Sequence, residues 1–124
     1  MPIKSWIEKD KKRVMAIVSG NFSIEDILLT INNTIEDPDF GKGFNILSDH
    51  TEIETVITTE QAKMTASHLE MLSKYFACSK WAVVTKKEAS FGMMRMFSVF
   101  LERIPIYLEL FKSLDEAEKW LDEQ

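Results

Sequence analysis

A chain of 124 residues with 45% hydrophobic residues predicts one domain over residues 1–124, large enough to bury a core without help from disulfides or metal. The formal net charge of -5 argues against a nucleic-acid-binding protein, because neutralising phosphates requires a basic surface. The single cysteine excludes an intramolecular disulfide and a cysteine-based zinc site, and we expect neither a metal nor a cofactor.

The sequence carries no evident membrane or export signal. Its first residues lack the apolar stretch of a signal peptide, and no apolar run approaches the ~20 residues that span a bilayer. We therefore expect a cytoplasmic protein without stable membrane insertion.

Two strands are predicted at the start of the chain. Residues 3–8 read as a strand that ends at a polar turn, and residues 14–20 are apolar on both faces. This pattern indicates an edge hairpin that leads into a buried central strand.

The first helix has clear start and stop signals. Ser23 is the expected N-cap with Asp26 three residues later, and isoleucine and leucine then recur at helical spacing. The helix should end near Asp37, because Pro38 restricts the residue before it.

The middle of the chain predicts a strand over residues 44–49 and a helix from about residue 59 to 76. Thr58 and Gln61 form an expected capping box at the start of that helix. Residues 50–58 between these elements could be a strand, a loop or a lid.

The last third predicts a strand at 81–85, a helix at 89–100, a strand at 105–111 and a helix at 113–121. The complete order is β-β-α-β-α-β-α-β-α. It predicts an α/β fold with a mostly parallel five-stranded sheet, an antiparallel edge strand and four helices.

Three stretches resemble one known family. They are "VSGNFSIEDILLTINNTIEDPDFGKGFNILSD", "SFGMMRMFSVFLE" and "FKSLDEAEKWL". With the order of elements, they resemble the SpoIIAA-like domains, which are grouped with STAS and SEC14 proteins, over about residues 12–122. The resemblance implies a SpoIIAA-like fold and a small bacterial protein, and it implies fold far more strongly than function.

The same family includes anti-sigma-factor antagonists that are switched off by phosphorylation of a serine in an Asp-Ser-Ser-Gly stretch. That stretch is missing here, and Thr58 and Thr59 occupy the start of the corresponding helix. Either threonine could take a phosphate at the helix N-terminus. We favour the simpler interpretation that Thr58 is only an N-cap.

Polar side chains near the carboxyl ends of predicted parallel strands suggest a ligand crevice, since open α/β sheets bind ligands there. The alternative is ordinary loop polarity at a sheet edge. The candidate ligand-binding residues are Asp49, His50, Thr85, Lys86, Ser90 and Arg95.

The helix at 89–100 also suggests a partner surface. A helical wheel puts one set of apolar residues against the sheet, namely Met93, Phe97, Phe100, Leu101 and Ile104. Phe91 and Val99 flank Arg95 on the opposite side, where aromatic and arginine groups are common interface anchors. Gly92 is interpreted as a close-approach or turn residue at the helix start.

Two functional classes follow. The first is a non-catalytic interaction or regulatory module that self-associates or binds another protein. The alternative is a carrier of a small anionic or lipid-like ligand, held at the strand ends or between sheet and helices. Excess apolar pocket volume would favour the carrier. An enzyme is not expected, because no acid and base pair can be named.

Overall fold

Five strands form one mixed sheet in the computed structural model, which describes residues 2–123. The strands follow one another across the sheet in chain order, as β1 (Ile3–Glu8), β2 (Arg13–Gly20), β3 (Asn45–Ile53), β4 (Lys80–Val84) and β5 (Tyr107–Phe111). β1 pairs antiparallel with β2, and all other neighbours are parallel. The predicted parallel sheet with an antiparallel edge strand is confirmed.

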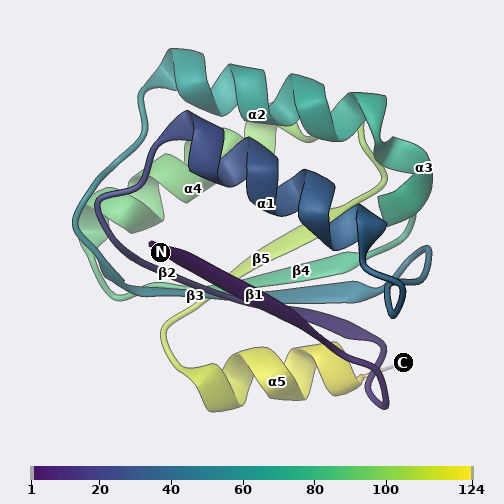
Figure 1. The fold of residues 1–124 in the computed structure, drawn as a ribbon. Helices are drawn as coiled ribbons and strands as arrows, with labels where there is room; N and C mark the ends of the chain where they lie inside the picture. Colours follow the sequence, from purple (N-terminus) through teal and green to yellow (C-terminus); the bar gives the residue numbers. More distant parts are fainter. Residues whose placement is uncertain (1, 124) are drawn as a thin grey trace.

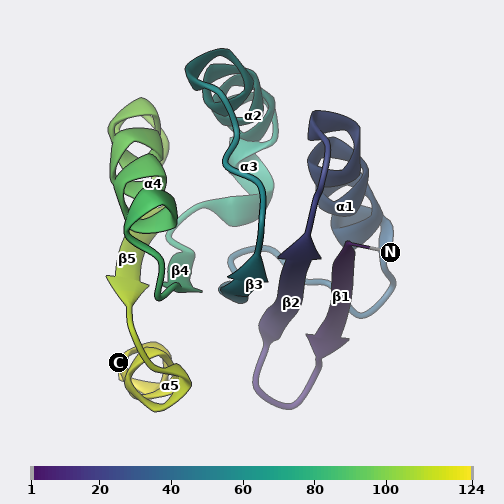
Figure 2. The same cartoon turned by 90° about the vertical axis from the view of Figure 1, so that its left-hand side faces the viewer.

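Helices cover the two faces of the sheet unequally, as Figures 1 and 2 show. One face carries α1 (Ile24–Glu36), α2 (Thr59–Met71), α3 (Ser73–Phe76) and α4 (Glu88–Phe100). The other face carries α5 (Leu114–Asp122), which lies under the later strands of the sheet. No helix between residues 2 and 123 is both long and apolar enough to cross a membrane.

The prediction of four helices is wrong by one, because the helix expected over residues 59–76 is divided. Leu72 ends α2 with φ -105° and ψ 17°, which is outside the helical region, and α3 follows as a separate short turn of helix. Apolar spacing continues across this break, so the sequence pattern could not reveal it.

The predicted helix starts are confirmed at atomic detail. The Asp26 amide donates to the Ser23 hydroxyl at 3.2 Å, and the Ser23 amide donates to the Asp26 carboxylate at 2.9 Å. Thr58 and Gln61 make the same reciprocal pair at the start of α2. These capping boxes satisfy amides that have no partner inside the helix.

β3 is longer than predicted. The sequence suggested a strand ending at Asp49, but the strand continues to Ile53 because the parallel neighbour β2 extends to Gly20 and supplies ladder partners. Four of the residues left unassigned, 50–53, therefore belong to the sheet. His50 lies inside β3 and not beyond its carboxyl end.

α4 faces the sheet as the wheel predicted. Met93, Phe97, Leu101 and Ile104 are buried. The close-approach interpretation of Gly92 is wrong: the residue lies within α4, and among the described residues a Cβ atom added there would meet no atom within 4 Å apart from its chain neighbours and its own helix backbone.

Candidate functional site

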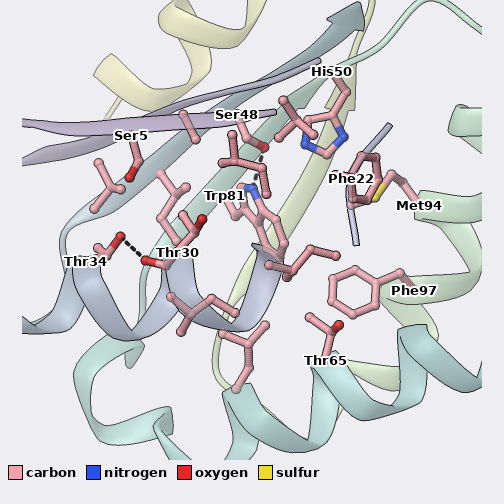
Figure 3. A pocket seen from close by; sticks show the side chains of 18 of the residues that line it. Ser5, Phe22, Thr30, Thr34, Ser48, His50, Thr65, Trp81, Met94 and Phe97 are labelled. Atoms are coloured by element: carbon pink, nitrogen blue, oxygen red, sulfur yellow. Dashed lines mark hydrogen bonds between the residues drawn. The ribbon is translucent and has the colours of Figure 1, made fainter. Parts of the chain in front are cut away.

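A cavity of about 150 Å³ lies between the sheet and helices α1, α2 and α4, and Figure 3 shows it from close by. Side chains of a strand point alternately to its two faces, so every second residue of the central strands borders this space. We call this space the core cavity. Its sheet side includes Ala16 of β2, Ile46, Ser48 and His50 of β3, and Trp81 of β4.

Two residues that border the core cavity are packed less completely than their chain neighbours on the opposite face of the sheet. Ile46 and Trp81 lie on the central strands beneath the helices, yet both are only half-buried because they border the core cavity. Their chain neighbours Leu47 and Ala82 belong to the cluster that packs on α5, and they are 1% and 0% exposed. At these strands the space lies on the face that α1, α2 and α4 cover.

Most polar groups around the core cavity are already used. The hydroxyls of Thr30, Thr34 and Thr65 each donate to the backbone carbonyl four residues earlier, at 2.7, 2.8 and 2.9 Å. Such back-bonding satisfies a hydroxyl within its own helix. These threonines consequently present mainly their methyl groups to the space.

Two side chains of β3 keep free hydrogen-bonding capacity. Trp81 donates its indole N–H to the Ser48 hydroxyl oxygen at 2.9 Å, while the hydroxyl proton of Ser48 has no acceptor among residues 2–123. No side chain or backbone group in the described chain is hydrogen-bonded to the imidazole of His50. Burial lowers the pKa of His50 to about 4, although the nearby Asp49 carboxylate raises it in part. His50 is thus neutral near pH 7.

An irregularity in β3 accompanies His50. Ile17 pairs with Asp49 and Ser19 pairs with Glu52, so β3 contains one residue more than β2 between these two pairs. A β-bulge of this kind changes the direction of nearby side chains and is frequent beside functional sites. His50 directly follows the last regular pair.

The core cavity approaches the surface between β1 and α1. A groove along this seam shares Ile3, Ser5 and Thr30 with the cavity lining, so these three residues separate the two spaces. Ser5 is solvent-exposed. Figure 3 shows Ser5 and His50 at opposite ends of the space.

Of the six predicted ligand-binding residues, only His50 lines the core cavity. Asp49 accepts hydrogen bonds from the amide and the hydroxyl of Thr51, at 2.9 and 2.7 Å. A ligand role for Asp49 remains a prediction.

The other predicted crevice residues lie at the β4–α4 connection. Thr85 is fully buried and donates to the hydroxyl of buried Ser90 at 2.8 Å, which ties the end of β4 to the start of α4. Lys86 and Arg95 are exposed. The Thr85–Ser90 pair therefore has a structural role, and ligand binding by this group stays a prediction.

The predicted partner surface on α4 has the expected exposure. Val99 is 56% exposed, and the Arg95 guanidinium lies 4.9 Å from the ring centre of Phe91. This contact is a cation–π arrangement. Whether these residues contact a partner remains a prediction.

The two threonines at the start of α2 differ in their contacts. Thr58 is the N-cap, as predicted, and Thr59 is exposed with its hydroxyl 3.6 Å from the sulfur of Met96. Phosphorylation of either residue stays a prediction.

Comparisons with known proteins concern the fold. No protein-family model and no curated protein matches the sequence significantly. The structure is similar to that of an uncharacterised protein of the DUF3478 family with a SpoIIAA-like fold from Shewanella loihica PV-4, with a TM-score of 0.67 and 18% sequence identity. The similarity covers 96% of this chain and 93% of the other. The chain therefore has the SpoIIAA-like fold that its sequence motifs predicted.

Proposed function

We propose that the protein binds a small apolar molecule in the core cavity. The observation that carries this proposal is a space of about 150 Å³ in an otherwise packed α/β domain. Apolar cavities of roughly 150 Å³ bind molecules of the size of benzene. The ligand class is therefore a molecule with one aromatic ring or a short alkyl chain.

This proposal develops the lipid-like form of the carrier hypothesis and not the anionic form. None of the residues between 2 and 123 that line the core cavity is an aspartate, glutamate, lysine or arginine. A buried anion without a partner is strongly unfavourable. The location differs from the predicted crevice, because the space lies between sheet and helices.

The seam between β1 and α1 supports a route for the ligand. Among residues 2–123, Ile3, Ser5 and Thr30 line both the surface groove and the cavity. β1 is an edge strand with a neighbour on one side only, so its displacement would break fewer contacts than that of a central strand. We propose that the ligand enters there. We also propose that the protein is bacterial and cytoplasmic.

Filling part of the core cavity should strongly weaken the binding of an apolar ligand. Ala16→Leu replaces a methyl group with an isobutyl group inside the space, and we expect the affinity for benzene or toluene to fall by about tenfold or more. Binding would be measured by ligand-observed NMR and by the rise in unfolding midpoint, since a ligand at about 100 times its Kd stabilises by about 2.7 kcal/mol.

Ala89→Leu is the matched control, because it makes the same change at an exposed position of α4. It should bind these probes as the wild type does. If neither benzene nor toluene binds the wild type, or if Ala16→Leu binds them equally well, the proposal is wrong.

We also propose, from a separate observation, that the α4 surface binds a protein partner or a second copy of the chain. The support is the exposed Val99 beside the Arg95–Phe91 pair. Arg95→Glu combined with Phe91→Ala is expected to lower the molar mass measured by light scattering from an oligomer to a monomer. Lys119→Glu, an exposed charge reversal on α5, should leave the mass unchanged. A wild type that is already monomeric would rule out self-association.

A further inference from the structure

We propose that the ligand carries one neutral hydroxyl or carbonyl group, which hydrogen-bonds to Ser48 and His50 while the apolar body fills the rest of the core cavity. This inference rests on the proposed function, since it assigns the chemical class of the molecule bound at the same site. It follows from the polar groups of the cavity lining that can still form a hydrogen bond with a ligand.

The polar groups of the lining divide into satisfied and available ones. The three helix threonines donate within their own helices, and the Trp81 indole N–H is taken by Ser48. Within residues 2–123, the sheet-side groups without a hydrogen-bond partner are the imidazole of His50, the hydroxyl proton of Ser48 and the hydroxyl of Ser5, of which Ser5 is solvent-exposed. Buried polar groups nearly always have at least one hydrogen-bond partner, and Ser48 has one in Trp81, so it is His50 that points to a polar group from outside the described chain.

The two available groups complement one small polar head. Ser48 and His50 are two residues apart on β3 and both line the same space, as Figure 3 shows. A neutral imidazole offers one N–H donor and one acceptor nitrogen, and the Ser48 hydroxyl can donate. A ligand hydroxyl can accept from one of these residues and donate to the other, and a carbonyl can accept from both.

The surroundings of His50 disfavour a charged head. From the helix layer the lining there is apolar, with Phe22 before α1 and Met94 and Phe97 on α4. The carboxylate of Asp49, the adjacent residue of the strand, is the charged group that raises the pKa of the His50 imidazole. A second anion inside the space would have no cation beside it, so the head must be neutral.

The position of this head suits the proposed entrance. Ser5 borders the groove, and His50 lies at the far end of the space. A molecule that enters between β1 and α1 would reach His50 with its polar end first. Its apolar part would then lie beneath α1 and α2.

Three probes of similar size test this inference, namely benzene, phenol and benzoate, against the wild type and His50→Phe. In an apolar cavity without a partner, phenol binds more weakly than benzene because its hydroxyl loses its hydrogen bonds to water. We expect the wild type to bind phenol about tenfold more tightly than benzene and to bind benzoate most weakly. His50→Phe retains a ring without nitrogen atoms and should lose the preference for phenol while still binding benzene.

The outcomes separate this inference from the proposed function. Failure of the wild type to bind any probe contradicts both. Binding of benzene without a preference for phenol, or a preference that persists in His50→Phe, overturns only the assignment of the polar head. Tightest binding of benzoate would also overturn it, because the head would then be charged. Benzene binding by His50→Phe verifies that the variant is folded with its cavity intact.

Discussion

Leu47→Ala is expected to lower the free energy of unfolding by about 4 kcal/mol, whereas Ile46→Ala should lower it by only about 2 kcal/mol. Leu47 is 1% exposed and packs in the cluster on α5. Its truncation leaves a new void among well-packed atoms. Ile46 borders the core cavity and therefore has fewer packing partners to lose. Urea denaturation followed by circular dichroism at pH 7 measures both values.

Neighbouring positions on one strand make this comparison well matched, because both residues belong to β3 and differ mainly in the face they occupy. Comparable losses for the two variants would contradict a void beneath the helices. Adding benzene gives a further check. It should stabilise Ile46→Ala more than it stabilises the wild type, and it should stabilise Leu47→Ala only as much as the wild type, since only the first change enlarges the core cavity.

The second large effect concerns pH. The pKa of His50 is lowered from 6.5 to about 4 by burial, so between these values the unfolded chain binds a proton that the folded protein does not. Stability therefore rises with pH across this window. The contribution of neutral His50 to the free energy of unfolding is fully present above about pH 6.5. It is lost as the pH falls toward 4, by roughly 3 kcal/mol in total.

His50→Phe provides the reference, because it removes this titrating group. Denaturation midpoints are measured at half-unit steps between pH 7 and 4. The wild type should lose more stability than His50→Phe as the pH falls across this window. Asp122 contributes little there, since its hydrogen bond with Arg13 lowers the pKa of that carboxyl below 3.8. Parallel pH profiles for the two proteins would show that His50 is solvated in the folded state.

Local signals explain why the fold could be predicted so closely. Helix caps depend on residues only a few positions apart in the sequence. The structure confirms the predicted helix starts at Ser23 and Thr58 and the predicted helix end at Asp37. The extension of β3 to Ile53 was missed because Thr51 and Glu52 are polar and the ladder partners come from distant β2. The break at Leu72 was missed because apolar spacing continues through it.

The core cavity itself could not be predicted. Hydrophobic periodicity shows that Ile46 and Trp81 face inward, but it does not show how far the opposing helices stand from the sheet. A volume depends on that distance and on the sizes of all facing side chains together. The available signal was a pair of polar residues, Ser48 and His50, at alternate positions of a buried strand. The sequence singled out His50 but placed it just past the carboxyl end of the strand, whereas it lies within β3.

The strand order of the sheet also affects how the domain is synthesised. Each strand pairs with the one made just before it, so the sheet can grow at one edge as the chain leaves the ribosome. No later strand has to be inserted between two earlier ones. After β4 the nascent domain already contains the sheet side of the ligand space, and α4 then covers it. If the protein binds a ligand as proposed, a ligand present during translation would thus meet an open site before the finished protein leaves the proposed route between β1 and α1.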